Sequence, residues 1–172
     1  VFEKIELPLV KILAAIENWG IAINRPALEE LGKKIDLEIS ESVKKIYLGA
    51  GDEFNINSSQ QVASIIFKKL NLGGLKPKKT TTGRASTAEE VLLKFKDSHP
   101  IINLILAYRD NFKIRSTYVE PILRASAKDS KIHTNFLQTG TATGRLSSEK
   151  PNVQNIPQES KWAEDLRSVF RA

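Results

Sequence analysis

The twenty residues from Gln138 to Pro157 restrict what this chain can fold into more than any other stretch. They read QTGTATGRLSSEKPNVQNIP and combine an arginine, a group of side-chain amides and five hydroxyl residues with almost no apolar residues. No apolar face recurs at period two, and two glycines and two prolines interrupt the run, so a buried strand is excluded. This signature segment is therefore either a binding surface or a disordered loop.

The order of hydrogen-bond donors in the signature segment favours a binding surface. Four donor side chains follow one another there: Arg145, Asn152, Gln154 and Asn155. Guanidinium and amide groups hydrogen-bond the acceptor edges of bases, and in the minor groove every Watson–Crick pair presents nearly the same acceptors. A protein that probes this groove tests the shape of a pair without reading its identity, which suits a copying enzyme. The alternatives are a structural surface arginine and amides that satisfy backbone groups of a proline-bounded loop.

The signature segment also carries a resemblance to a known family. Its pattern TGRLSSxxPNxQNIP is similar to the motif that opens the palm of family A DNA polymerases, the bacterial DNA polymerase I type. The similarity extends on both sides of this motif, to Ile132, His133, Thr134, Phe136, Gln138, Leu166, Arg167 and Phe170. The match is long and specific, so the chain resembles the start of a polymerase palm.

Weaker resemblances cover the first two thirds of the chain, in the order in which they occur in the family. Glu53–Val62 is similar to the family's FNxNSPKQL, and Lys78–Thr87 is similar to its thumb-tip KTKTGYSTS. The stretch from Tyr108 to Tyr118 is similar to YRxLxKLxSTY. The resemblance therefore spans essentially the whole chain.

The fold class implied is α+β, with a mainly helical thumb followed by short antiparallel β segments of the palm. The thumb would occupy residues 1–125, with a basic tip near 73–86, and the N-terminal part of the palm residues 126–172. Apolar residues repeat every three or four positions before this boundary and alternate after it, from Lys131 to Leu146. We expect the boundary inside the polar SAKDS stretch between the two patterns.

The resemblance implies that the parent protein is a DNA-directed DNA polymerase, a nucleotidyltransferase of DNA replication and repair that extends a primer with dNTPs. This chain would hold primer–template DNA. The expected DNA-binding residues are Arg145, Asn152, Gln154, Asn155, Asn57, Ser58, Lys79, Thr80, Arg109 and Lys113. The competing interpretation of the tip is a solvated loop, and that of Arg109 and Lys113 is a pair that only makes their helix soluble.

No catalytic or metal-binding residue is expected in this chain. Two-metal phosphoryl transfer needs carboxylates on rigid elements, and by resemblance these follow the end of the chain. Mg²⁺ would therefore belong to the parent enzyme and not to residues of this chain. Four acidic pairs are expected to be solvated or capping charges: Glu29 with Glu30, Asp52 with Glu53, Glu89 with Glu90, and Glu164 with Asp165.

The chain begins with Val1 and contains no methionine, so we expect a piece of a longer protein that is inactive alone. The remaining palm and fingers would lie on the same or on a separate chain. The alternatives are a non-catalytic DNA-binding module and the N-terminal subunit of a split polymerase.

Composition agrees with a nucleic-acid partner and excludes some other classes. The net charge is +6 with a pI near 9.5, and there are no cysteines, so disulfides and thiolate metal sites are excluded. No apolar run approaches the roughly 20 residues of a membrane span, so no membrane is expected. The expected location is cytoplasmic, at the nucleoid, if the source is bacterial.

The chain departs from the family pattern in three places, one of them Ala163, Glu164 and Asp165, which replace a typically Gly-Arg-rich turn. Glu159 stands where the family usually carries an arginine, and a carboxylate beside a phosphate backbone would repel it. This puts a primer-strand contact there in doubt, with Lys161 as a substitute. At the tip, Arg84 replaces the common tyrosine.

The pattern also predicts individual elements. Helices are expected over about 8–19, 24–48 and 100–118, the last ending at Pro121, with an extended piece at Ile21–Ile23. Two capping pairs, Asn57 with Gln60 and Ser86 with Glu89, are expected to open shorter helices, and strands are expected to join near Gly140. Among the remaining residues of interest, His133 is expected on a strand surface, and Tyr118 and Trp19 are expected to pack.

Overall fold

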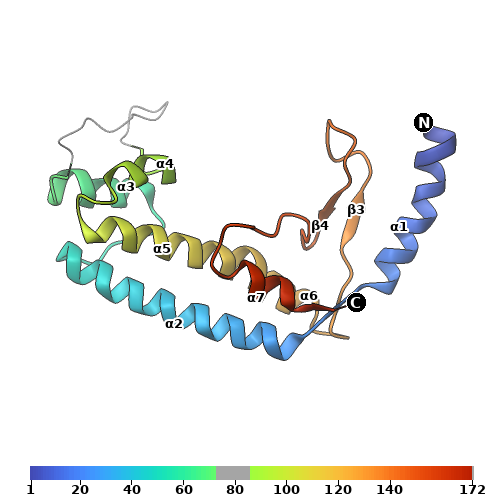
Figure 1. Ribbon diagram of the computed structural model, residues 1–172, viewed down its shortest axis with the longest axis horizontal. Helices are drawn as coiled ribbons and strands as arrows, with labels where there is room; N and C mark the ends of the chain where they lie inside the picture. Colours follow the sequence, from blue (N-terminus) through green and yellow to red (C-terminus); the bar gives the residue numbers. More distant parts are fainter. Residues whose placement is uncertain (73–85, 172) are drawn as a thin grey trace. The chain divides into compact units, whose positions relative to one another are not determined.

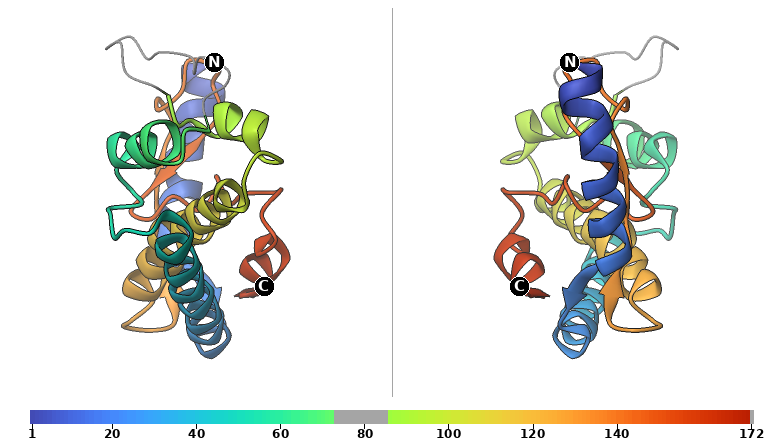
Figure 2. Two further views of the ribbon diagram at one scale, coloured as in Figure 1. Left: turned by 90° about the vertical axis from the view of Figure 1, so that its left-hand side faces the viewer. Right: turned by 90° about the vertical axis from the view of Figure 1, so that its right-hand side faces the viewer.

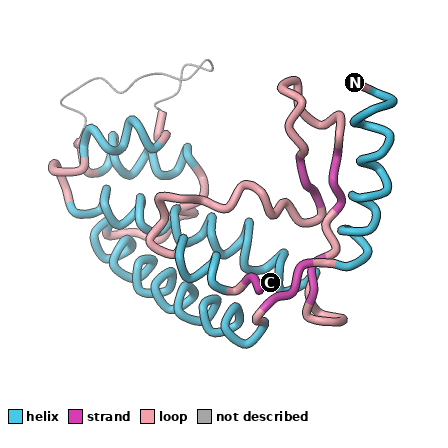
Figure 3. Tube along the Cα trace, turned by 45° about the vertical axis from the view of Figure 1, so that its right-hand side comes forward, coloured by secondary structure: helices cyan, strands magenta, loops and turns pink. Residues whose placement is uncertain are grey.

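The computed structural model describes residues 1–72 and 86–171, and most of them are helical, as Figure 3 shows. The α-helices are α1 (Leu7–Trp19), α2 (Arg25–Ala50), α3 (Ser59–Ala63), α4 (Glu89–Leu92), α5 (Pro100–Ile114), α6 (Glu120–Ala125) and α7 (Ala163–Ser168). Helical turns of other kinds adjoin them, with π geometry at Phe2–Glu6, Ser64–Lys69 and Arg115–Val119 and 3₁₀ geometry at Leu93–Phe95. The α+β class is confirmed.

The strands are short and all antiparallel. A three-stranded sheet has the order β2-β1-β5, formed by Lys131–Ile132, Ile21–Ile23 and Phe170–Arg171. A separate two-stranded sheet joins β3 (Asn135–Leu137) to β4 (Ser147–Glu149). The predicted extended piece at Ile21–Ile23 is thus confirmed as the central strand of the first sheet.

The described chain forms two compact units. One comprises Val1–Lys34 together with Lys113–Ala172, and the other comprises Ile35–Phe112. The helices α2 and α5, which Figure 1 labels, each contribute residues to both units. The thumb and palm ranges are a division by function and stay a prediction.

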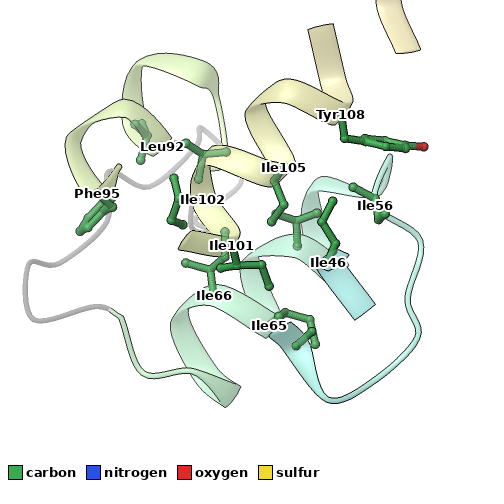
Figure 4. Packing of buried hydrophobic residues seen from close by; sticks show 13 residues of the cluster. Ile46, Ile56, Ile65, Ile66, Leu92, Phe95, Ile101, Ile102, Ile105 and Tyr108 are labelled. Carbon is green, nitrogen blue, oxygen red and sulfur yellow. The ribbon is translucent and has the colours of Figure 1, made fainter. Parts of the chain in front are cut away.

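The unit Ile35–Phe112 is built around an apolar core. Side chains from α2, α4, α5 and the turn Ser64–Lys69 point toward one another there, as Figure 4 shows. The fully buried members include Ile46, Val62, Ile66, Leu92, Ile102 and Ile105. Burial of branched aliphatic side chains stabilises such a unit by about 1.5–3 kcal/mol for each one fully buried.

The long helix α2 follows from its sequence pattern. Leu28, Leu31, Ile35 and Ile46 recur at helical spacing and are buried, which gives one apolar stripe. At its start, the side chain of Asn24 accepts a hydrogen bond from the Ala27 backbone N–H at 3.5 Å. The predicted helix over about 24–48 is confirmed with small differences at both ends.

Three predicted helix boundaries are wrong, one of them at α4, whose N-cap is Ala88 and not the predicted Ser86. The helical path does not stop at Pro121, because a π-helical turn at Arg115–Val119 precedes it and the proline falls in the first turn of α6. A proline is tolerated there because the first turn of a helix needs no N–H donor. The N-cap of α3 is Ser58, one residue after the predicted Asn57, and its hydroxyl accepts from the Gln61 N–H at 3.4 Å.

Two expectations about the second half also need correction. The alternating pattern from Lys131 to Leu146 holds β2 and β3, but these strands belong to different sheets, and the partner of β3 begins only at Ser147. Three residues of the signature segment therefore form a strand. The exclusion of a buried strand is wrong over β4, because its buried side chain, Ser148, is polar and hydrogen-bonded rather than apolar.

Candidate nucleic-acid interface

The signature segment begins as the loop of a β-hairpin, which we call the signature hairpin (residues 135–149). Its strands pair in the register Asn135↔Glu149, Phe136↔Ser148 and Leu137↔Ser147. The loop between them turns at Gly144, which has a φ of +73°, the left-handed region that glycine enters without strain. The hydroxyl of Thr141 donates to the carbonyl of Arg145 at 2.7 Å and thereby holds the turn closed.

Gly140 is required where the two arms of the signature hairpin approach each other. A Cβ at this position would lie 2.0 Å from the Ser147 hydroxyl and 3.2 Å from Cβ of Leu137. A larger residue would therefore push the arms apart at the base of the loop.

Two buried hydroxyls hold the backbone after the hairpin. The Thr134 hydroxyl lies 3.0 Å from the carbonyl of Glu149 and 2.7 Å from that of Pro151, and its side chain is buried. The Ser148 hydroxyl accepts from the N–H of Val153 at 3.2 Å. Buried backbone groups that lose such partners cost about 1–3 kcal/mol, so these hydroxyls fix the path of residues 149–153.

The amide of Asn152 serves the backbone of the signature segment. Its Oδ1 accepts from the N–H groups of Gln154 at 3.0 Å and Asn155 at 3.2 Å. The hydroxyl of the buried Tyr118 in turn donates to the carbonyl of Asn155. The oxygen of Asn152 thus supports the backbone, and the predicted DNA contact of this residue stays a prediction.

Three other donors of the segment point away from the protein. The side chains of Arg145, Gln154 and Asn155 are exposed. None of the three makes a side-chain hydrogen bond or ion pair with another described residue. The backbone beneath them is fixed while the side chains are available, which is the arrangement that a binding surface requires.

The signature hairpin is also attached to α1 and the turn before it. The Glu17 carboxylate accepts from the Phe136 N–H at 2.6 Å, and the Gln138 amide donates to Glu6 Oε2 at 2.9 Å. Figure 1 shows α1 beside β3, and the two elements are in contact. The views of Figure 2 agree with this placement of α1 next to the hairpin.

His133 lies between β2 and β3, so its predicted place on a strand is wrong. Its Nδ1 is 2.8 Å from the Glu17 carbonyl oxygen and its Nε2 is 2.9 Å from Asp129 Oδ2. Both oxygens act as acceptors, so this geometry favours the protonated ring, in which both nitrogens donate. The hydrogen bond to Asp129, followed by that to Glu17, raises the pKa of His133 above its ordinary value.

Of the remaining predicted contact residues, Asn57, Ser58 and Arg109 belong to the unit Ile35–Phe112. Asn57 donates its amide hydrogen to the Tyr108 hydroxyl at 3.0 Å, and Ser58 caps α3. Lys113 is exposed near the end of α5. Lys79 and Thr80 lie outside the described residues, as does Arg84.

Arg109 has an internal partner. Its guanidinium donates to the carbonyl of Thr87 and, at 3.3 Å, to the Thr87 hydroxyl. The arginine is half-buried, and burial lowers its pKa from the ordinary value. The interpretation that Arg109 only makes its helix soluble is therefore wrong, because its side chain holds the backbone at Thr87.

Among the other residues singled out from the sequence, Trp19 differs from expectation. Glu159 is exposed, and Lys161 Nζ lies 4.7 Å from the ring centroid of Trp162. Tyr118 is buried as predicted, whereas Trp19 is 76% exposed, so its predicted packing is wrong. The Nζ of Lys131 lies 5.1 Å from the Trp19 ring centroid.

The acidic pairs predicted from the sequence lie on the surface. All four acidic pairs named from the sequence are exposed. Within residues 1–72 and 86–171, no three His, Cys, Asp or Glu side chains are grouped so that they could hold a metal ion. Over the same residues, no helix is both long and apolar enough to cross a membrane.

Sequence reasoning missed the residues that support the candidate interface. Thr134 entered only as part of a resemblance, and Ser148 and Glu17 were not singled out. Glu17 is separated from Phe136 by more than a hundred positions, so no local pattern indicates their contact. The pairing register of β3 with β4 would have indicated Thr134 and Ser148. That register cannot be set from the sequence without knowing where β4 begins.

Comparison with known proteins agrees with this architecture. The chain is 41% identical to DNA polymerase I of Treponema pallidum (strain Nichols) over 172 residues, all of this chain and 17% of the relative. It is 42% identical to DNA polymerase I of Bacillus subtilis (strain 168) over 170 residues, 98% of this chain and 19% of the relative. The chain thus spans about a fifth of the length of these curated relatives.

A solved structure is also similar. The POL domain of Pol1 from M. smegmatis, in complex with DNA primer-template and dNTP, matches with a TM-score of 0.89 and 36% identity. The match covers 97% of this chain and 29% of that one. The sequence profile of DNA polymerase family A matches residues 25–172. On these grounds the chain belongs to DNA polymerase family A.

Proposed function

We propose that this chain is the DNA-holding part of a template-directed DNA polymerase, with residues 1–125 as thumb and 126–172 as the first part of the palm. The observation that carries the proposal is the contrast within the signature segment. Its backbone is held by Thr134, Ser148 and Tyr118, whereas Arg145, Gln154 and Asn155 expose donors. The solved relative, which is a complex with DNA primer-template and dNTP, supports the choice of ligand.

In this proposal, Arg145 and the exposed amides donate to minor-groove acceptors of the base pairs nearest the primer end. These acceptors are nearly the same for every correct pair, so the contact tests pair shape and is independent of sequence. Asn152 contributes indirectly, because its oxygen holds the backbone N–H groups of Gln154 and Asn155. Mismatched pairs displace the acceptors and lose these bonds.

The thumb contacts are proposed to be contacts with phosphates, which position a duplex without reading it. Lys113 is exposed on α5, and Lys79 and Thr80 remain candidates at the tip. Arg109 donates to Thr87, and Asn57 and Ser58 hold α3 and Tyr108 in place. We therefore assign Asn57, Ser58 and Arg109 chiefly to the internal support of the unit Ile35–Phe112.

The parent enzyme would extend a primer with dNTPs and divalent cations, at the nucleoid if its source is bacterial. The described residues do not fit a two-metal site, because they bring no group of metal ligands together. We propose that the purified chain binds DNA without extending a primer. Primer extension by this chain alone would contradict the expectation.

The test is a fluorescence anisotropy titration of the chain against a labelled primer–template at several salt concentrations. Arg145→Ala is expected to weaken binding by about 1–3 kcal/mol, the usual cost of a lost arginine–base contact. Arg171→Ala is the matched control, since Arg171 is exposed and its side chain bonds to no other described residue. Equal losses in the two variants would mean that net charge alone holds the DNA.

A further inference from the structure

The attachment of the signature hairpin to α1 rests on polar contacts. Of the apolar residues of α1, only Leu13 is buried, whereas Ile12, Ile16 and Trp19 are exposed. Hydrogen bonds therefore contribute more than apolar contacts to the attachment of the hairpin to α1. Such bonds are directional, so they fix a position more narrowly than apolar contact does.

Glu17 is the residue on which these contacts converge. Its carboxylate accepts from the Phe136 N–H at 2.6 Å, and its main-chain carbonyl accepts from the His133 ring at 2.8 Å. One residue of α1 thus holds the chain at two points on the path into β3. Glu6 makes a further contact, with the Gln138 amide at the start of the loop.

The bond to Phe136 meets a specific need of β3. Successive N–H groups of a strand point to opposite edges, and β3 has β4 on one edge only. The Phe136 N–H, which is bonded to Glu17, points away from β4. Exposed strand edges of this kind are open to wrong pairing, and the Glu17 carboxylate covers this one.

The groups around His133 also link the end of α1 to the chain that leads into β3. Asp129 holds its Nε2, the Glu17 carbonyl holds its Nδ1, and Lys131 is bonded to the Trp19 carbonyl at 2.9 Å. The ring also fills the space beside Gly20, where a Cβ would lie 2.7 Å from it. The His133 ring therefore lies in contact with the end of α1 and with the loop before β2.

From these contacts we propose that Glu17 is a positioning residue, which sets where the signature hairpin lies and so keeps Arg145 of its loop in the DNA-binding arrangement. The DNA half of this proposal rests on the proposed function. Because only the chains with the hairpin in place would bind, the apparent Kd would rise as that fraction falls. The carboxylate itself would not touch DNA.

Glu17→Ala and Glu17→Gln separate this role from charge. Both variants remove a negative charge, which on electrostatic grounds alone would tighten binding to a polyanion. The side-chain amide oxygen in Glu17→Gln can still accept from the Phe136 N–H, whereas alanine cannot. The proposal therefore predicts weaker binding for Glu17→Ala and near-normal binding for Glu17→Gln. Glu3→Ala is the matched control, because Glu3 is exposed on the preceding turn.

Two measurements are made on each variant of the full chain. The first is amide hydrogen exchange by NMR, where Glu17→Ala is expected to speed exchange at Phe136 by roughly tenfold, because a bond to a charged acceptor is lost. The second is the anisotropy titration with primer–template, where the same variant is expected to bind at least about threefold more weakly. Glu17→Gln and Glu3→Ala are expected neither to speed this exchange nor to weaken binding.

The outcomes separate this proposal from the proposed function. Unchanged exchange at Phe136 in Glu17→Ala overturns the positioning role. The role is also overturned if Arg145→Ala weakens DNA binding while Glu17→Ala leaves binding unchanged or makes it tighter. If neither Arg145→Ala nor Glu17→Ala affects binding, the proposed grip by the signature segment fails. Faster exchange at Phe136 in that case still supports Glu17 as the residue that holds β3.

Discussion

The unit Ile35–Phe112 and the signature hairpin are held together in different ways. The unit buries a cluster of branched aliphatic side chains from four helices. The hairpin and the segment after it depend on a few polar side chains, among them Thr134, Ser148 and Glu17. Apolar burial is spread over many contacts and is non-directional, whereas each hydrogen bond serves one atom pair. A framework can thus be robust while the surface that it carries is sensitive to single atoms.

The largest expected effect is a cavity in the apolar unit. Ile105→Ala removes a fully buried side chain from α5 and is expected to cost about 2–5 kcal/mol in the free energy of unfolding. Leu48→Ala, at a position that is 86% exposed, is expected to change it by less than about 0.5 kcal/mol. Urea denaturation compares the two. Similar losses would mean that the helical core is not what stabilises this unit.

Two tyrosines test the comparison with an expected effect of intermediate size. The Tyr118 hydroxyl donates to the Asn155 carbonyl in the signature segment, and the Tyr47 hydroxyl donates to the Phe54 carbonyl at 3.0 Å in the apolar unit. Each Tyr→Phe change is expected to cost about 1 kcal/mol of stability. Only Tyr118→Phe is expected to weaken DNA binding as well, in the anisotropy titration. Equal effects of both variants on binding would mean that the hydrogen bond from Tyr118 to the signature segment has no specific part in DNA binding.

The smallest expected effect is a pH dependence at His133. Asp129 raises the pKa of His133 above 6.5, and His133 lowers that of Asp129 below 3.8. The pair therefore stabilises the fold fully between about pH 4 and 6.5, and its contribution is lost as pH rises through the raised His133 pKa or falls through the lowered Asp129 pKa. Both side chains are exposed at the surface, so the effect is small.

Proton NMR titration of the His133 ring tests this dependence directly. In Asp129→Asn the titration midpoint is expected to move down, because the carboxylate that favours the imidazolium is gone. His133→Gln assigns the signal. An identical midpoint in the presence and absence of the Asp129 carboxylate would show that the ion pair does not form in solution.

Helix positions were predictable because helical periodicity is a local property. The stripe in α2 and the extended piece at Ile21–Ile23 could be read from a few neighbouring residues. The course of the chain at Pro121 could not be predicted in this way, since a π-helical turn at Arg115–Val119 changes the helical register before the proline. The cap at Ser58 could not either, because Asn57 and Ser58 both have a glutamine three residues later. The contact of Asn57 with Tyr108 decides between them.

The sequence by itself determined the family, the fold class and the segment that matters, because these depend on residue types in a fixed order. It named Arg145, Gln154 and Asn155 as candidate donors, and the structure leaves all three exposed. Only the tertiary structure decided that Tyr118 bonds to the Asn155 carbonyl and that Glu17 holds β3. These roles depend on contacts between residues brought together by folding, and an N–H or a carbonyl needs a partner in space, wherever that partner lies in the chain.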